Sequence, residues 1–313
     1  MTQPQRTRIR SLSRLGAVSL LSLGLIVAAS VAPATASPGA TPNGSAGGSY
    51  VAIGDSFTSG QGAGPWLTEG GASGLPGPCL RSVSGSYPTI TANSSSYREA
   101  LNFACSGADT KAVLAQIGAI DGRIKLKASL VTLTVGGIDA GSNQVLAACA
   151  PDPTSERCSY TVSAATANLG AVGMKLVGTY AAAAKAFPKA RIVVLNYPRL
   201  FDPRLPSALA PILNTATDAL NRVIAGAVTA TNNPRVSLTD ITDEFAGHGI
   251  GSAESYISYD PYHPSDPANF HPNVLGNTAG YAAALRTDGA VRGRLPRRRT
   301  HKRPSRCGSS RSK

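Results

Sequence analysis

Short apolar runs alternate with helix-like stretches from about residue 50 to residue 286. Runs of mainly apolar residues predict buried strands at residues 50–53, 101–104, 130–135, 191–197 and 236–238. Helices are predicted at residues 109–120, in the Ala-rich stretch 160–187, in the three- and four-residue apolar spacing of 209–227, and at 272–286. Strands that alternate with helices are typical of a parallel sheet with helices on both faces, so an α/β fold is expected.

The two ends of the chain differ from this middle part. Residues 1–36 have a basic start, an apolar stretch at 15–32 and the triplet Ala34-Thr35-Ala36, which predict a secretory signal peptide. A retained membrane anchor is the alternative. Residues 37–48 are rich in Gly, Ser and Pro and predict a flexible linker. One domain is expected at residues 49–286, followed by a basic disordered tail at 287–313.

The formal charge of +13 arises at the two ends. The segment beginning at Arg286 contains eleven Lys and Arg residues but a single acid, Asp288. The middle of the chain is about neutral, and nothing there favours nucleic acid as a partner. Two interpretations of the tail remain open: a solvated segment, or a segment that binds anionic cell-surface polymers.

Residues 50–60, with the sequence YVAIGDSFTSG, contain the first candidate for chemistry. The predicted strand ends at a turn that begins with Gly54, and Ser56 lies just beyond the strand's carboxyl end, where open α/β sheets bind their ligands. A serine there is a nucleophile if a base reaches it and hydrogen-bond donors await the oxyanion. The alternative is a serine that caps an ordinary strand-to-helix turn.

Three later segments strengthen the catalytic interpretation: Cys105-Ser106-Gly107, Gly136-Gly137-Ile138-Asp139, and Phe270-His271-Pro272-Asn273 with Gly276. In this order, over roughly residues 49–286, they resemble the blocks of the SGNH (GDSL-type) hydrolase family, especially its secreted actinobacterial esterases and lipases. The resemblance implies a flavodoxin-like, three-layer αβα sandwich and the hydrolysis of carboxylic esters without metal or cofactor. It also implies that Ser56 is the nucleophile, that His271 is the base, and that the backbone N–H groups of Ser56 and Gly107 form the oxyanion hole.

The base is chosen from four histidines. His263 follows Asp260 by three residues, which suits a base and its orienting carboxylate, but Pro267 would interrupt a helix after it. His271 directly precedes an uninterrupted predicted helix and matches the family's last block, so it is the predicted base. The other two, His248 in a small-residue loop and His301 in the tail, are not assigned a role.

The chain departs from the family pattern at two positions. The family often has Asp three residues before its histidine, where this chain has Ala268; the carbonyl of Ala268 or the carboxylate of Asp266 is expected to orient His271 instead. The third block normally supplies an Asn side chain to the oxyanion, but Ile138 cannot donate a hydrogen bond from its side chain. Asp139 is expected to bond backbone amides of its own turn.

The chain contains five cysteines, and export of the protein would allow them to form disulfides. Four of them permit three connectivities, and the resemblance implies the pairs Cys79–Cys105 and Cys149–Cys158. The remaining one, Cys307, lies in the tail. No Cys/His cluster has the spacing of zinc ligands. The long segment 60–98 is expected to fold back as a loop held by Cys79, with Trp66 as its packing anchor or as a wall of the site.

The function expected is that of a secreted, extracellular serine esterase or lipase, acting as a monomer through an acyl-enzyme. Lipids, aryl esters and acetylated sugars all remain open as substrates. Two alternatives follow from the same residues. One is a catalytically degraded binding protein of this fold, favoured by Ile138, and the other is a carbohydrate deacetylase.

Overall fold

A computed structural model describes residues 48–68, 79–97 and 99–292. The predicted signal peptide, most of the linker, His301, Cys307 and the tail beyond Arg292 lie outside the described residues. Within those ranges, no helix combines the length and apolar character needed to cross a membrane.

A five-stranded parallel sheet forms the centre of the domain. Its strands are β1 (Ser49–Gly54), β4 (Ala100–Asn102), β5 (Ala128–Thr134), β6 (Arg191–Leu195) and β7 (Val236–Thr239). They lie in the order β4-β1-β5-β6-β7, and every neighbouring pair is parallel. This is the flavodoxin-like order, and each strand overlaps a run predicted from the sequence.

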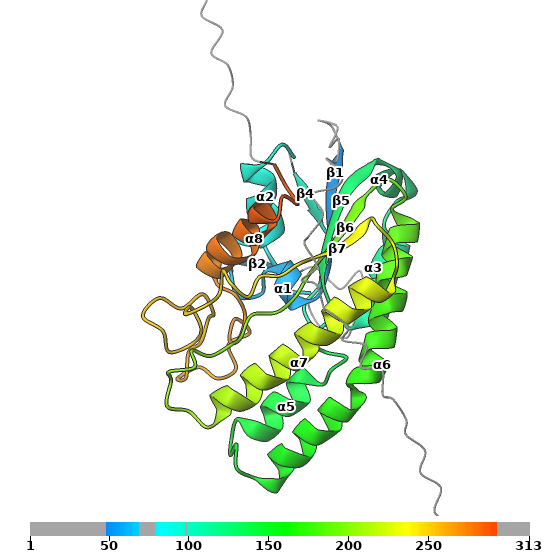
Figure 1. The fold of residues 1–313 in the computed structure, drawn as a ribbon. Coiled ribbons are helices and arrows are strands. Elements are labelled where there is room, and N and C mark those ends of the chain that lie inside the picture. The colour runs from blue at the N-terminus through cyan, green and yellow to red at the C-terminus, as the bar shows by residue number, and fades with distance from the viewer. Residues whose placement is uncertain (1–47, 69–78, 98, 293–313) are drawn as a thin grey trace, which may run out of the picture. The chain divides into compact units, whose positions relative to one another are not determined.

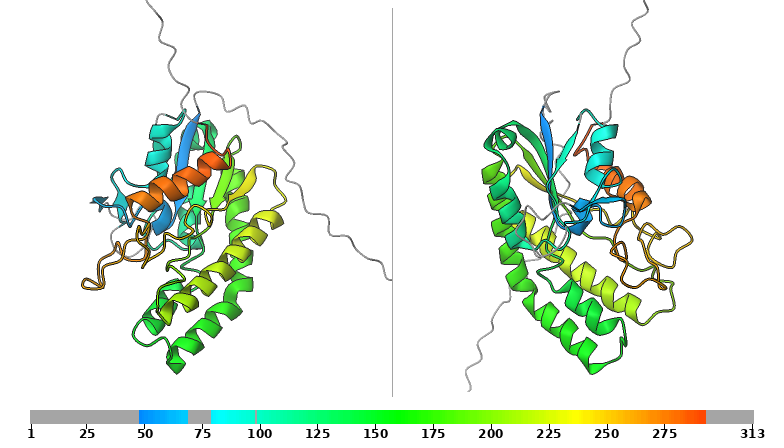
Figure 2. Two further views of the ribbon diagram at one scale, coloured as in Figure 1. Left: turned by 60° about the vertical axis from the view of Figure 1, so that its left-hand side comes forward. Right: turned by 180° about the vertical axis from the view of Figure 1, so that it is seen from behind.

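Helices cover both faces of the sheet (Figures 1 and 2). Val51 and Ile53 of β1 pack with the helices α3 (Thr110–Ala119), α6 (Glu156–Ala186) and α7 (Leu209–Ala230). The alternate residues Tyr50 and Ala52 pack on the other face, in the same cluster as α2 (Tyr87–Ser94) and α8 (Ala282–Thr287). Because successive strand residues point to opposite faces, both faces of β1 must be apolar. The predicted three-layer α/β sandwich is confirmed.

Several elements were not predicted from the sequence. The segment 60–98 contains α2 and a small hairpin of β2 (Trp66–Leu67) and β3 (Arg81–Ser82), in addition to irregular loop. Two further short helices are α4 (Gly122–Lys127) and α5 (Ser142–Cys149). These elements are short, and short elements carry little hydrophobic periodicity.

The last helix and the domain's end differ from prediction. Pro272 pairs with Ile257 in an isolated antiparallel bridge, so the helix begins two residues later and continues through the π-helical turn η1 (Gly276–Tyr281) into α8. Ala290 and Val291 are buried, and Val291 N–H donates to the carbonyl of Leu285. The packed domain therefore extends beyond the predicted boundary at Arg286.

Part of the helical layer extends past the carboxyl edge of the sheet. Figure 1 shows α5 together with the first halves of α6 and α7 beyond the strand ends. The disulfide Cys149–Cys158 joins the end of α5 to the first turn of α6, as the resemblance implied. The site described below lies at the base of this three-helix extension, where the strand order reverses beside β1.

Candidate active site

A tight turn at the end of β1 carries Ser56. Gly54 has φ +133°, and a side chain there would collide with the carbonyl of Thr134, so the turn requires glycine. Asp55 caps the following short helix α1 (Ser56–Ser59) by accepting a hydrogen bond from Phe57 N–H at 3.0 Å. Ser56 is the first residue of α1, so its N–H has no acceptor within the helix.

His271 meets Ser56 from a segment 215 positions away in the sequence. The distance between His271 Nε2 and Ser56 Oγ is 2.8 Å, and that between His271 Nδ1 and the carbonyl oxygen of Asn269 is also 2.8 Å. Gly62 packs directly on the backbone carbonyls of His271 and Pro272, so the loop after Ser56 approaches this segment at a distance that only glycine allows. The nucleophile candidate, the base candidate and an orienting acceptor are thus joined by two consecutive hydrogen bonds.

The expected orienters of His271 were wrong. The carbonyl of Ala268 accepts the backbone N–H of His271 at 3.2 Å, and Asp266 Oδ1 accepts the N–H of Ala268 at 2.8 Å. Both are occupied in forming the turn itself. The ring is held by Asn269 because the backbone at Phe270, with φ +62°, turns the preceding carbonyl toward the imidazole.

The other described histidines lie apart from Ser56. His263 pairs with Asp260 at 2.7 Å as the spacing suggested, but its side chain is 73% exposed and this hydrogen bond raises its pKa. His248 stacks on Tyr256 with a ring-centroid distance of 3.8 Å. The structure therefore brings only His271, among the histidines it describes, to Ser56.

Burial shifts the ionisation of two groups at the site in opposite directions. It lowers the pKa of His271 from 6.5 to about 4, against the opposing effect of the hydrogen bond to Asn269. It raises the pKa of Asp55 from 3.8 to about 6, although hydrogen bonds from Thr134 and Tyr197 partly offset the shift. At neutral pH the imidazole is neutral, which is the form that can accept a proton.

Tyr197 connects two of the motif segments and was not identified from the sequence. Its hydroxyl donates to Asp55 Oδ2 at 2.5 Å and accepts the N–H of Gly137 at 3.2 Å. Asn221 on α7 fixes its backbone through hydrogen bonds to both N–H and C=O. The only signal in the sequence was its position as the last residue of a predicted strand, at the same sheet edge as Ser56.

The predicted oxyanion donors lie beside the end of β1. Cys105 N–H donates to the carbonyl of Gly54 at 3.0 Å, which places the turn that follows, with Gly107 at φ +75°, beside the end of β1. Ile138 lines the same cavity as Ser56. Asp139 has a structural role, but its partners were not those expected, because it accepts hydrogen bonds from Thr110 at the start of α3 and from Lys175 of α6.

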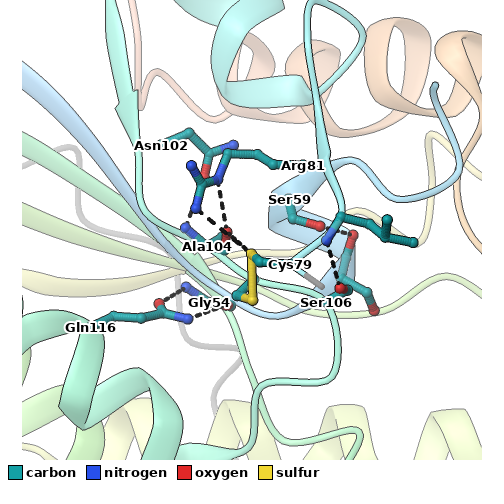
Figure 3. Close-up of a disulfide and its surroundings, with 11 residues drawn as sticks. Gly54, Ser59, Cys79, Arg81, Asn102, Ala104, Ser106 and Gln116 are labelled. Atoms are coloured by element: carbon teal, nitrogen blue, oxygen red, sulfur yellow. Dashed lines mark hydrogen bonds between the residues drawn. A yellow bond between two sulfur atoms is a disulfide. The ribbon is translucent and has the colours of Figure 1, made fainter. Parts of the chain in front are cut away.

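Figure 3 shows the disulfide Cys79–Cys105 beside the end of β1. Arg81 Nε donates to the carbonyl of Ala104 at 3.1 Å, so the loop is also held by a hydrogen bond to the segment that follows β4. The helix α3 also holds the end of β1, because the side-chain amide of its Gln116 forms two hydrogen bonds with the backbone of Gly54, at 2.8 and 2.9 Å. Trp66 donates to the carbonyl of Gln61 at 2.8 Å and anchors the loop, in line with one of its two expected roles.

An apolar cavity of about 200 Å³ opens beside Ser56 and His271. It runs between the three helices that extend beyond the sheet. Its walls are mainly aliphatic; they include Val145 and Leu146 of α5, Val162, Ala165 and Leu169 of α6, and Leu213, Ala216 and Leu220 of α7. Among the residues described, no group of three or more His, Cys, Asp or Glu side chains could hold a metal ion.

Comparison with known proteins shows the family to which the chain belongs. The model of the GDSL-like lipase/acylhydrolase family matches residues 52–279. Lipase 1 of Streptomyces coelicolor is 30% identical over 276 residues, which cover 85% of this chain and 95% of that protein. Among solved structures, the extracellular lipase of Streptomyces rimosus has a TM-score of 0.65 at 29% identity, and phospholipase A1 of Streptomyces albidoflavus NA297 one of 0.66 at 32% identity. Each match covers 77% of this chain and 99% of the other. With a match that spans both the Ser56 turn and the His271 segment, the chain belongs to the GDSL-like lipase/acylhydrolase family.

Proposed function

We propose that Ser56 and His271 form a catalytic dyad that hydrolyses carboxylic esters through an acyl-enzyme. The observation that carries the proposal is the 2.8 Å contact between Ser56 Oγ and a buried, neutral His271 whose other nitrogen is held by Asn269. A serine becomes nucleophilic when an adjacent base takes its proton, and the base must be oriented by a third group. Here a backbone carbonyl does the orienting, so no carboxylate is needed.

The reaction proceeds in two halves. Ser56 Oγ attacks the ester carbonyl carbon as its proton passes to His271 Nε2, and the negative charge develops on the carbonyl oxygen. The N–H groups of Ser56 and Gly107 stabilise that oxyanion. The tetrahedral intermediate collapses, and the imidazolium returns the proton to the departing alcohol. Water then attacks the acyl-enzyme with His271 again as base, which releases the acid and restores the serine.

The cavity favours esters of aliphatic acids. Its walls offer methyl and methylene groups from three helices, and an acyl chain buried there gains free energy in proportion to the apolar area removed from water. An acetyl group would leave most of this volume unused. The names of the similar proteins, lipase and phospholipase A1, support the same substrate class. Carbohydrate deacetylation and binding without catalysis are therefore not favoured.

Export of the protein is part of the proposal. Residues 1–36 have the pattern of a signal peptide, two disulfides are present among the described residues, and one similar structure is of an extracellular lipase. N-terminal sequencing of protein recovered from culture medium would test it, and the expected first residue is Ser37. An intact N-terminus in a membrane fraction would contradict export by cleavage.

Substitution Ser56→Ala tests the dyad. The mature protein is expected to hydrolyse p-nitrophenyl octanoate and to react with a fluorophosphonate probe, and Ser56→Ala is expected to lose both activities. His271→Ala should lower kcat by about 10⁴ or more, because it removes the base. The matched control is His263→Ala, which removes an exposed imidazole and should leave kcat within about twofold. Full activity in Ser56→Ala would overturn the assignment.

A further inference from the structure

The segment that carries His271 contains an irregularity in strand pairing. Phe270 N–H donates to the carbonyl of Ser258 at 2.8 Å, and Ser258 N–H donates to the carbonyl of His271, also at 2.8 Å. Two consecutive residues, Phe270 and His271, therefore lie opposite one residue, Ser258. The antiparallel bridge between Ile257 and Pro272 continues the pairing on one side. This hydrogen-bond pattern is that of a G1 β-bulge.

Phe270 occupies the position of this bulge that is normally glycine. Its φ of +62° lies in the left-handed region, which a bulky side chain adopts at a cost in free energy. Asn232, with φ +46°, is the only other non-glycine residue with positive φ in the described part of the chain, and asparagine tolerates that region well. The bulge would form with less strain if residue 270 were glycine, so the backbone geometry does not explain why the chain has a phenylalanine there.

The backbone and the ring of Phe270 serve different parts of the site. The left-handed turn directs the carbonyl of Asn269 back to His271 Nδ1, at 2.8 Å. The ring lines the apolar cavity, supported by Tyr259 at a centroid distance of 5.2 Å and by Phe201 at 6.3 Å. Bulges next to active sites commonly re-aim a side chain, and here the residue that forms the bulge also forms part of the cavity wall.

We propose that Phe270 is both the positioning residue of His271 and a specificity-determining wall for the acyl chain. Its backbone turns the orienting carbonyl onto the imidazole, and its ring packs against the acyl chain that occupies the cavity. The ring's packing against Tyr259, Phe201 and the substrate offsets the strain of the left-handed turn. The inference rests on the proposed function, since it assumes that the cavity receives the acyl group.

Two substitutions separate the backbone role from the ring role. Phe270→Gly removes the ring but keeps a residue that adopts the left-handed turn, whereas Phe270→Ala removes the ring and retains the strain. Both should lower the ratio of kcat/KM for p-nitrophenyl octanoate to that for p-nitrophenyl acetate by about tenfold, because the longer chain loses a contact. On acetate, kcat should stay within about threefold of wild type in Phe270→Gly. It should fall about tenfold in Phe270→Ala, since a small displacement of His271 is costly.

The control substitution is Asn232→Gly, which removes the backbone strain at the other non-glycine residue with positive φ, in the turn after α7. It should change neither the octanoate-to-acetate ratio nor kcat on acetate. An unchanged ratio in Phe270→Gly overturns the specificity role, even if Phe270→Ala does not fold. Equal acetate kcat in folded Phe270→Gly and Phe270→Ala overturns the positioning role. Failure of the proposed function would be distinct, because the wild-type protein would then hydrolyse neither ester.

Discussion

His271 differs from an ordinary surface histidine in its ionisation. Burial keeps its pKa at about 4, and a base must be neutral to take the proton of Ser56. As the pH falls, the neutral form should therefore persist well below 6.5 and be lost only near pH 4. The buried carboxyl of Asp55, with its pKa raised to about 6, lies on the same turn as Ser56 and is the second group that titrates there.

We expect kcat/KM on a soluble aryl ester to change little between pH 7 and pH 5 and to be half lost near pH 4. A pH–rate profile measures this directly, with a check that the protein stays folded at each pH. The same profile for Asp55→Asn separates the two groups. A loss of kcat/KM with a midpoint near pH 6 that occurs in the wild type and disappears in this variant belongs to Asp55. A loss with a midpoint near pH 6.5 that persists in the variant would contradict the shifted pKa of His271.

Ile138 is one of the two positions at which this chain departs from the pattern of its family. It lines the cavity with Ser56, where a side-chain donor to the oxyanion is expected. The N–H of its neighbour Gly137 is held by Tyr197, so the loop is anchored independently of residue 138. Replacement of the isoleucine should therefore leave the path of the loop in place.

Substitution Ile138→Asn should raise kcat by up to about 10²-fold with little change in KM. A donor that acts only on the charge of the transition state lowers the barrier without strengthening substrate binding. Steady-state kinetics on p-nitrophenyl octanoate measure the effect, and Ile138→Val is the control that changes volume without adding a donor. Unchanged kcat in a folded Ile138→Asn protein would mean that this side chain does not face the oxyanion.

At the scale of elements, the wide turn η1 joins the His271 segment to α2. The fully buried Asn277 accepts the N–H of Tyr87, the first residue of α2, at 2.8 Å. Its amide nitrogen donates to the carbonyls of Pro272 and Asn273 at 2.8 and 2.9 Å. The side chain of Asn277 thus supplies a hydrogen-bond acceptor to the first N–H of α2 and fixes the segment that follows His271. Isolated π-helical turns are often found at functional sites.

Substitution Asn277→Ala should lower the free energy of unfolding by about 2–4 kcal/mol. It leaves the buried Tyr87 N–H and Pro272 carbonyl without partners, and each unsatisfied group costs about 1–3 kcal/mol. Urea denaturation measures the change. Thr278→Ala, at an exposed position of the same turn whose hydroxyl bonds only to Val274, is the control and should cost less than about 1 kcal/mol. Equal stability of the two variants would contradict this role of Asn277.

At the scale of the whole molecule, the packed domain ends later than the sequence suggests. Besides the burial of Ala290 and Val291, the guanidinium of Arg191 donates to the carbonyl of Ala290. The first residues after Arg286 therefore belong to the domain and not to the basic tail. The predicted tail of 287–313 is shortened accordingly at its start.

Truncation after Arg292 should leave the melting temperature and esterase activity unchanged, whereas truncation after Arg286 should lower the melting temperature by several degrees. The second truncation removes two buried apolar side chains and the acceptor of Arg191. Thermal unfolding of both proteins tests this.

Binding of the full-length and Arg292-truncated proteins to a soluble polyanion at low and high salt tests whether the tail binds anionic polymers, because nonspecific electrostatic attraction weakens as salt rises. Equal binding would exclude a role for the tail in polyanion binding.

The sequence by itself determined the strands, the longest helices and the α/β class, because these depend on local information: apolar runs and helical periodicity. Short motifs at a strand end and before a helix, matched to the family's blocks, also predicted the pair Ser56 and His271. The order of the motif blocks carried the family resemblance, and with it the disulfide pairs Cys79–Cys105 and Cys149–Cys158.

Only the tertiary structure decided what orients His271 and what surrounds Ser56. Asn269, Tyr197 and Asn277 act through contacts with distant segments, or through a backbone carbonyl that every residue possesses, so no residue type marks them in the sequence. The left-handed turn at Phe270 is equally hidden, since local preference favours glycine there and only the bulge against Ser258 imposes it. The apolar cavity arises between three helices that are separate in the sequence, and its shape follows from their packing.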